Sequence, residues 1–296
     1  MGVPLVSVVV TAHGGLPEQF RCLAAICAPD PPREIILADG GDVDPTLAIA
    51  AAFPGVMVLH APGQTVPQLR WAAARRATGD IIVATEARMV PTPGWWRAFA
   101  DAHARFPSAL VVGGVVRVAG EASDFDRGLY LSEYVAFAPG IPAGPALVLS
   151  SGNLSYTRAA LLAEGDILDR GAWDFALFER WRDRPDAIRQ GAAEVVFING
   201  MTVAEARTMR YTFGRAYAAD RVRQAPAWKR AVLAVGALAL PLLLTGRALA
   251  AARRYRSPAA TLGGVAWLVL FNLDWSAGEL AGYLRGDPSA HRTNGG

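Results

Sequence analysis

The first third of the chain alternates short apolar runs with segments in which apolar residues recur every three to four positions. The apolar runs cover residues 6–11, 34–39, 56–60 and 81–85, and the helical patterns cover residues 17–27, 46–53, 66–78 and 95–106. An unbroken β-branched run such as residues 6–11 is typical of a strand buried on both faces. Strands that alternate with helices in this way predict a parallel sheet with right-handed crossovers.

The same α/β pattern continues less regularly to residue 224. Residues 110–118 and 194–198 have the pattern of strands, and residues 123–137, 173–184 and 203–223 have that of helices. We therefore predict one α/β domain over residues 1–224, with a mostly parallel sheet flanked by helices.

The composition changes over residues 225–296. Residues 231–246 and 259–273 carry no charge, and each run is shorter than the ~20 residues of a membrane-spanning helix. A spanning hairpin would place Arg247, Arg253, Arg254 and Arg256 on the far side, against the positive-inside tendency. We predict a pair of apolar membrane-associated helices that lie in the interface or are re-entrant, on the cytoplasmic side. The alternative is a helical pair packed on the protein itself.

Overall composition supports a membrane surface as a partner. Hydrophobic residues make up 52% of the chain, and the mean hydropathy of +0.24 is high for a soluble enzyme. The basic tail fits anionic lipid better than nucleic acid, because aromatic and basic residues are not interleaved over a polar platform. Cys22 and Cys27 lie in one predicted helix, so we expect free thiols.

Polar motifs follow the predicted strands, where α/β proteins place their ligand sites. Residues 37–46 read LADGGDVDPT after the second strand, residues 69–80 read LRWAAARRATGD, and residues 86–88 read EAR after the fourth strand. No G-x-G-x-x-G follows the first strand, which excludes a dinucleotide-binding dehydrogenase. The first lysine is Lys229, and no glycine-rich phosphate loop is present, which disfavours a nucleotidyltransferase.

In this order and spacing the motifs resemble those of the family 2 inverting glycosyltransferases of the GT-A fold. The family pattern V-V-D-D-G-S-x-D-G-T is matched at Asp39, Gly41, Asp44 and Thr46. The pattern A-R-N-x-G-x-x-x-A-x-G-D is matched at Arg70, Ala77, Gly79 and Asp80, and Glu86-Ala87-Arg88 falls on the D-x-D motif. The chain departs from the family at Gly40, Asp42, Pro45, Trp71, Ala73 and Arg88. Looser similarity covers residues 151–158, 174–179 and 278–283, the last resembling a G-E-x-x-G-Y ending of membrane-associated bacterial members.

The resemblance implies an enzyme of hexosyltransferase type. It would move a sugar from a nucleotide-sugar donor to a lipid-linked or cell-surface glycan acceptor at the cytoplasmic membrane face, in cell-envelope glycan biosynthesis. The departures leave an alternative open, a catalytically inactive relative that acts as a binding or scaffold subunit.

Five residues are the candidates for donor binding: Asp39, Asp44, Arg70, Glu86 and Arg88. Asp39 could accept hydrogen bonds from the base or ribose, or cap the following turn. Asp44 could bind the donor or cap the next helix. Arg70 could face the donor phosphates or simply belong to a basic helix.

The transfer also needs a base that deprotonates the acceptor hydroxyl. Glu179 is the first candidate and Asp174 the second, with an exposed helix salt bridge as the alternative for Glu179. Gly152 and Asn153 fall on a family segment that lies toward the acceptor.

Arg88 stands where the family has the second acidic residue of its metal motif. A guanidinium cannot ligate a metal and repels one, so Glu86 alone makes a poor site for Mg²⁺ or Mn²⁺. Arg88 could itself pair with the diphosphate and replace the metal charge. The alternative is that donor binding has been lost and the protein is a catalytically inactive relative. A metal ion held weakly by Glu86 and the donor phosphates is a further possibility, and we expect no certain cofactor.

Overall fold

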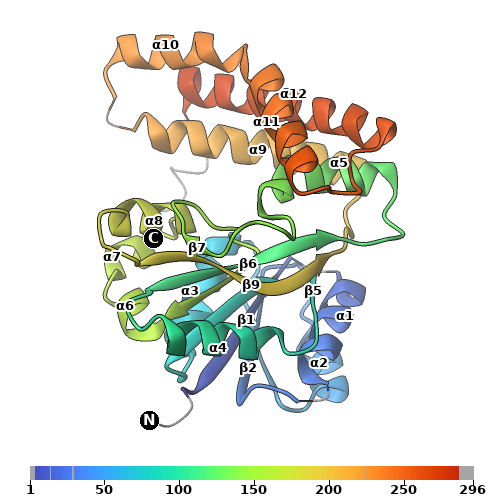
Figure 1. The fold of residues 1–296 in the computed structure, drawn as a ribbon, viewed down its shortest axis with the longest axis vertical. Helices are drawn as coiled ribbons and strands as arrows, with labels where there is room; N and C mark the ends of the chain where they lie inside the picture. The colour runs from blue at the N-terminus through green and yellow to red at the C-terminus, as the bar shows by residue number, and fades with distance from the viewer. Residues whose placement is uncertain (1–3, 14, 29, 224, 287–296) are drawn as a thin grey trace. The chain divides into compact units, whose positions relative to one another are not determined.

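The structure is a computed structural model that describes residues 4–13, 15–28, 30–223 and 225–286 (Figure 1). The chain divides into two compact units. Unit 1 comprises Met1–Ala119 and Phe137–Gly200, and unit 2 comprises Gly120–Ala136 and Met201–Gly296. The predicted domain boundary at residue 224 lies inside unit 2, because the helix over Val203–Arg221 packs with the helices that follow it.

Unit 1 is built on a nine-stranded sheet of order β3-β2-β1-β4-β8-β6-β9-β5, with β7 paired to β9. The strands are β1 (Val6–Ala12), β2 (Glu34–Asp39), β3 (Val56–His60), β4 (Ile81–Glu86), β5 (Met89–Pro91), β6 (Val111–Val118), β7 (Gly144–Pro145), β8 (Asn153–Thr157) and β9 (Ile188–Phe197). Strands β3, β2, β1 and β4 are mutually parallel, as the sequence pattern predicts.

The expectation of a mostly parallel sheet is wrong for the other half. Four of the eight strand pairings are parallel and four are antiparallel, so the sheet is mixed. Strand β8 runs antiparallel between β4 and β6. Its sequence, NLSYT, hides it from a hydrophobic pattern, because Asn153 and Ser155 are completely buried and satisfied by hydrogen bonds.

Helices cover both faces of this sheet. They are α1 (Leu16–Cys27), α2 (Thr46–Ala52), α3 (Val66–Arg76), α4 (Trp95–Arg105), α6 (Arg158–Leu162), α7 (Gly165–Asp169) and α8 (Asp174–Trp181). Figure 1 shows α4 crossing the near face of the sheet. A large hydrophobic core joins β1, β2 and β4 to α3 and α8, and Trp71 and Trp181 are completely buried in it. This core determines how α3 and α8 are placed at the site.

Unit 2 consists of α5 (Asp124–Glu133), α9 (Val203–Arg221), α10 (Ala227–Ala237), α11 (Leu240–Arg254) and α12 (Leu262–Arg285). The predicted apolar run over residues 231–246 is divided between α10 and α11, which are bent by 60°. Helix α12 continues past the predicted end at residue 273, because its acidic residues have partners. Asp274 pairs with Arg207, and Glu279 accepts hydrogen bonds from Trp275 and Tyr283.

The G-E-x-x-G-Y segment has a structural explanation within unit 2. A Cβ on Gly278 would lie 2.1 Å from the carbonyl oxygen of Tyr211, and one on Gly282 would lie 2.4 Å from that of Arg215. The two glycines therefore let α12 approach the α9 backbone closely. Burial and Glu279 raise the pKa of Tyr283 to about 12, so its hydroxyl donates to that carboxylate.

Within the described residues no single helix is both long enough and apolar enough to cross a bilayer, although the bent pair α10 and α11 passes that test jointly. The membrane-associated pair expected from the sequence therefore stays a prediction.

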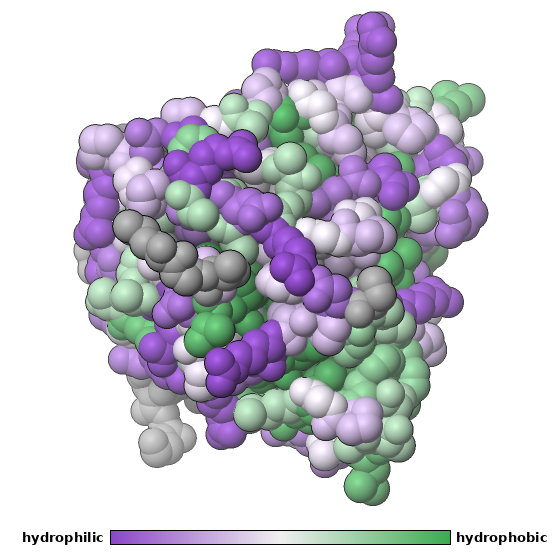
Figure 2. Space-filling view, turned by 60° about the horizontal axis from the view of Figure 1, so that its bottom comes forward, coloured by the Kyte–Doolittle hydropathy of each residue, from purple (hydrophilic) through white to green (hydrophobic). Residues whose placement is uncertain are grey.

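Hydrophobic and hydrophilic residues share the face seen in Figure 2, where hydrophobic residues gather toward the lower part of the view.

Candidate donor site at the strand ends

The register of four parallel strands brings the predicted motifs to one edge of the unit 1 sheet. Ala12 at the end of β1 pairs with Asp39 at the end of β2, and Thr11 pairs with Glu86 at the end of β4. Asp39 also lies beside His60, the last residue of β3. His60 was not among the residues that the sequence singled out as candidates. Its position at the end of a predicted strand could have identified it, because the strand that ends in Asp39 is the neighbour of that strand.

Asp39 is completely buried and caps the turn that follows β2. Its Oδ2 accepts a hydrogen bond from the Gly41 amide at 3.1 Å and lies 3.3 Å from His60 Nδ1. Its Oδ1 accepts a hydrogen bond from Gln19 Nε2 at 3.0 Å. The turn-capping interpretation of Asp39 therefore describes this structure, and a contact with the donor stays a prediction.

Asp44 is exposed, and its Oδ1 accepts a hydrogen bond from the Thr46 amide at 2.9 Å, just before α2. The hydrogen bonds from Thr46 lower the pKa of Asp44 below its usual value. Asp44 therefore closes a turn just before α2, whose N-cap residue is Pro45 without a side-chain cap hydrogen bond, so Asp44 is not the helix cap that the alternative interpretation expects. Its exposure keeps the carboxylate accessible to solvent.

Glu86 and Arg88 form an ion pair at the end of β4. Arg88 Nε donates to Glu86 Oε2 at 2.8 Å, and Arg70 Nη2 lies 3.8 Å from Glu86 Oε1. Burial alone would raise the pKa of Glu86, but Arg88 and Arg70 outweigh it and lower the pKa. Glu86 is therefore held as a carboxylate between two guanidinium groups.

Arg70 of α3 connects this ion pair to α8. Its Nη1 donates to Asp174 Oδ2 at 2.5 Å, and the Tyr156 hydroxyl donates to Asp174 Oδ1. All three side chains are completely buried. Burial and Asp174 raise the pKa of Tyr156 well above 10, which keeps its hydroxyl protonated as a donor. Arg70 is thus placed to position its neighbours, and Tyr156 is a member of the network that the sequence analysis missed.

The two candidate bases on α8 lie in different surroundings. Asp174 begins the helix and is completely buried, whereas the Glu179 side chain is 62% exposed and pairs with Arg182 at 2.5 Å, three residues along the helix. Arg180 pairs with Glu164 and Asp166 instead of Glu179. Glu179 therefore has the geometry of the exposed helix salt bridge, and only Asp174 is linked to the strand ends.

Two departures from the family pattern are explained by packing. A Cβ on Gly40 would lie 2.9 Å from the carbonyl oxygen of Gln64 and 3.0 Å from both His13 Cε1 and Leu69 Cδ1, so a larger residue would need its neighbours to move. Trp71 is completely buried, and its Nε1 donates to the carbonyl oxygen of Ala172 at 2.8 Å. That bond ties α3 to the segment immediately before Asp174.

Gly152 and Asn153, the predicted acceptor-side residues, are buried beside β4. The Gly152 carbonyl accepts a hydrogen bond from Thr85 Oγ1 at 2.9 Å. Asn153 Nδ2 donates to the carbonyl oxygens of Val115 and Ala193, both at 2.8 Å, and its Oδ1 accepts from Trp95. Asn153 therefore joins β6, β9 and α4, and a contact with the acceptor stays a prediction.

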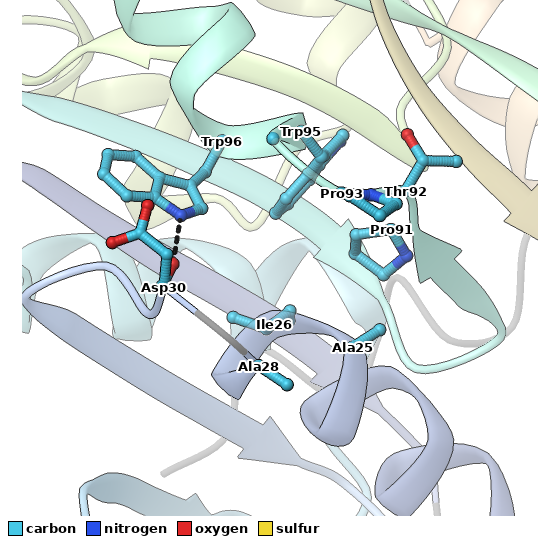
Figure 3. A pocket seen from close by; sticks show the side chains of 10 residues that line it. Ala25, Ile26, Ala28, Asp30, Pro91, Thr92, Pro93, Trp95 and Trp96 are labelled. Atoms are coloured by element: carbon cyan, nitrogen blue, oxygen red, sulfur yellow. Dashed lines mark hydrogen bonds between the residues drawn. The ribbon is translucent and has the colours of Figure 1, made fainter.

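The tryptophan pair that follows the EAR motif is part of the framework. A cavity of about 30 Å³ lies between the end of α1 and the start of α4, lined by Ile26, Asp30, Pro91 and Trp96 among others (Figure 3). Trp96 Nε1 donates to the carbonyl oxygen of Asp30 at 3.0 Å, and Trp95 Nε1 donates to Asn153. This volume is about that of one water molecule, so the cavity does not hold a sugar.

Comparison with known proteins identifies the family. The family model for glycosyl transferase family 2 matches residues 7–157, which is 151 of the 296 residues. A search of curated proteins finds no match. Among solved structures, the mannosyltransferase PcManGT from Pyrobaculum calidifontis, solved with GDP-Man and Mn²⁺, has 20% sequence identity and a TM-score of 0.54, with 94% of this chain and 87% of that chain covered.

A second similar structure is GalNAc-T7, solved with UDP, GalNAc and Mn²⁺. Its sequence identity is 12% and the TM-score is 0.53, with 75% of this chain covered and about half, 52%, of that chain. At these identities the two structures show a shared GT-A fold. Together with the family match, which covers β1 to β8 and all of the strand-end motifs, the fold leads to one conclusion. The chain belongs to glycosyl transferase family 2 and is an enzyme of that type.

Proposed function

We propose that this enzyme transfers a sugar from a nucleotide-sugar donor to a lipid-linked or cell-surface glycan acceptor. The observation that carries the proposal is the position of the Asp39 turn and the Glu86–Arg88 pair at the carboxyl ends of β2 and β4, the two parallel strands on either side of β1. Ligands of α/β proteins bind at such carboxyl ends. The similar structures PcManGT and GalNAc-T7, solved with GDP-Man and with UDP, support a nucleotide sugar as the donor.

Within this site we assign Asp174 a positioning role, and we do not assign the role of base to Glu179. Asp174 hydrogen-bonds Arg70, and Arg70 lies 3.8 Å from Glu86. Because both oxygens of Asp174 already accept hydrogen bonds, its role is to position Arg70 and, through it, Glu86.

Turnover of a panel of nucleotide sugars tests the function. The purified full chain is incubated with UDP-, GDP-, CMP- and dTDP-sugars, and release of the nucleotide is measured with and without a membrane-lipid extract as acceptor source. We expect one nucleotide class to raise the melting temperature and to be turned over, since a ligand at 100 times its Kd stabilises the folded state by about 2.7 kcal/mol. If no donor stabilises the protein and none is turned over, the inactive scaffold relative becomes the better description.

We also propose that unit 2 lies on the cytoplasmic face of an anionic membrane. Five large apolar residues of α10, α11 and their junction are 62–83% exposed and recur every three or four positions: Trp228, Val232, Val235, Leu238 and Leu242. No acidic residue occurs between Asp220 and Asp274, whereas this segment carries exposed Lys229, Arg247 and Arg253. Exposed apolar residues whose charged neighbours in the sequence are all cations fit an interface rich in anionic lipid. The occupant we commit to is therefore the bilayer surface.

Vesicle flotation of the full chain tests this surface. We expect binding to phosphatidylcholine vesicles that contain phosphatidylglycerol, and weaker binding to phosphatidylcholine alone. The double variant Val235→Asp/Leu242→Asp should reduce the bound fraction at least about tenfold, because two apolar contacts with the acyl region are replaced by charges that anionic lipid repels.

The matched control is Leu147→Asp/Val148→Asp, which changes two exposed apolar residues of unit 1 and should leave flotation unchanged. Point variants are preferable to removal of residues 225–296, because α9 packs on α12 and a truncation would expose that contact. Equal flotation of the α10–α11 variant and the control would contradict the membrane proposal.

A further inference from the structure

The turn between β4 and β5 holds Glu86 and Arg88 in a fixed arrangement. The Ala87 amide donates to the carbonyl oxygen of Thr11 at 2.9 Å, which ties the turn to β1. The Ile198 amide donates to the carbonyl oxygen of Arg88 at 2.9 Å, which ties it to the residue after β9. The backbone on both sides of the ion pair is therefore anchored to neighbouring strands, and the pair is presented at the strand ends without a flexible segment.

The residues at this turn do not fit a divalent cation. Mg²⁺ and Mn²⁺ need several oxygen ligands, and Mg²⁺ demands near-octahedral geometry. Glu86 is the only acidic residue of the EAR motif, and each of its oxygens faces a guanidinium group. Among the residues that the structure describes, no group of three or more His, Cys, Asp or Glu side chains could hold an ion. A cation bound to Glu86 would also meet the charges of Arg70 and Arg88.

Arg70 of α3, which lies beside Glu86, has buried hydrogen-bond donors without acceptors. Arg70 is completely buried, and its Nε and Nη2 atoms have no hydrogen-bond partner, although Nη2 lies 3.8 Å from Glu86. Buried donors of this kind are costly unless an acceptor is supplied. The carboxylate beside Arg70 Nη2 is that of Glu86, which is held by Arg88 in this structure. A phosphate group could replace Glu86 at Arg88, because it presents several charged oxygens and pairs with guanidinium in a bidentate manner.

We propose that Arg88 takes the place of the family's metal ion and binds the donor diphosphate directly, and that Glu86 holds the guanidinium group in place until the diphosphate binds. The inference rests on the proposed function, since it assumes a nucleotide donor. When the diphosphate replaces Glu86 as the partner of Arg88, the Glu86 carboxylate can move toward Arg70. There it accepts hydrogen bonds from the buried Nε and Nη2 atoms of Arg70. The exchange keeps every charge of the site paired: diphosphate with Arg88, Glu86 with Arg70, and Arg70 with Asp174.

The test is a calorimetric titration of the full chain with UDP, GDP, CDP and dTDP. Each titration is made with a chelator and again with added Mg²⁺ or Mn²⁺. We expect one nucleotide to bind with a Kd that changes by less than about threefold between these conditions. Arg88→Ala should weaken that binding by roughly 10- to 100-fold in both, which is the scale of a charged hydrogen bond. Arg88→Lys should recover part of the loss, because it keeps the charge but not the planar fork.

Two further variants sharpen the test. Arg88→Asp restores an acidic pair with Glu86 and should make binding dependent on the added metal. Arg97→Ala removes an exposed arginine that pairs with Asp30 and should leave the Kd unchanged. Binding that chelation abolishes and Mn²⁺ restores in the native protein would overturn the inference while the proposed function stands. If none of the four nucleotides binds under any condition, both the inference and the proposed function fail.

Discussion

Replacing Asp174 with asparagine is expected to lower sugar transfer by about 100-fold, whereas Glu179→Gln should change it by less than about threefold. Asp174 accepts hydrogen bonds from Arg70 and Tyr156, so its neutral amide analogue would lose the charge that holds the Arg70 guanidinium beside Glu86. A small displacement of groups that contact the substrate costs about 100-fold in rate. Glu179 forms only an exposed ion pair with Arg182, and such pairs contribute little to stability. Because Glu179 is not linked to the strand ends, its replacement should leave the transfer rate nearly unchanged.

The measurement is the initial rate of nucleotide release with the donor that the panel identifies, together with the donor Kd. Rates are compared well below the melting temperature of each variant, so that loss of folded protein does not enter. A positioning role predicts that Asp174→Asn affects kcat more than donor binding, and that Asp174→Glu recovers part of the rate. The opposite pattern, in which Glu179→Gln abolishes transfer and Asp174→Asn does not, would restore Glu179 as the base expected from the sequence.

Arg70→Leu is expected to lower the free energy of unfolding of unit 1 by about 3–5 kcal/mol, because it leaves the buried Asp174 charge without its cation. Arg75→Leu is the matched control on the same helix. Arg75 pairs with Asp169 at the surface, so its loss should cost less than about 1 kcal/mol. Urea denaturation followed by tryptophan fluorescence measures both, since Trp71 of α3 and Trp181 of α8 are buried in the hydrophobic core of unit 1.

A double variant measures how much of the stability loss comes from leaving one charge of the Arg70–Asp174 ion pair unpaired. Arg70→Leu/Asp174→Leu removes both charges and should be less destabilised than the sum of the two single variants, because no unpaired charge stays buried. Additive effects of the two replacements, or a loss below 1 kcal/mol for Arg70→Leu alone, would show that the ion pair does not support the site.

The sequence predicted the half of the fold in which local pattern and tertiary environment agree. Strands β1, β2 and β4 are apolar because both of their faces are buried, and α1 to α4 alternate with the strands at short spacing. Strand β8 escaped prediction because Asn153 and Ser155 are buried polar residues whose partners lie on distant strands. Helix α12 was predicted too short for a similar reason, since the partner of Asp274 is Arg207, 67 residues away.

The sequence by itself determined the family, the strand-end location of the motifs and the unusual EAR triplet, because each depends on residue order within about 90 residues. Only the tertiary structure decided what the individual residues do. Arg70 and Asp174 are 104 positions apart, and whether they face substrate or one another depends on how α3 and α8 pack in the core. Trp71 and Gly40 are departures from the family pattern in the sequence, but in the fold one anchors the segment before α8 and the other leaves room for His13. Long-range packing sets the burial and the charge pairing of a polar residue, and these two properties determine its role. The order of residues along the chain does not specify either property by itself.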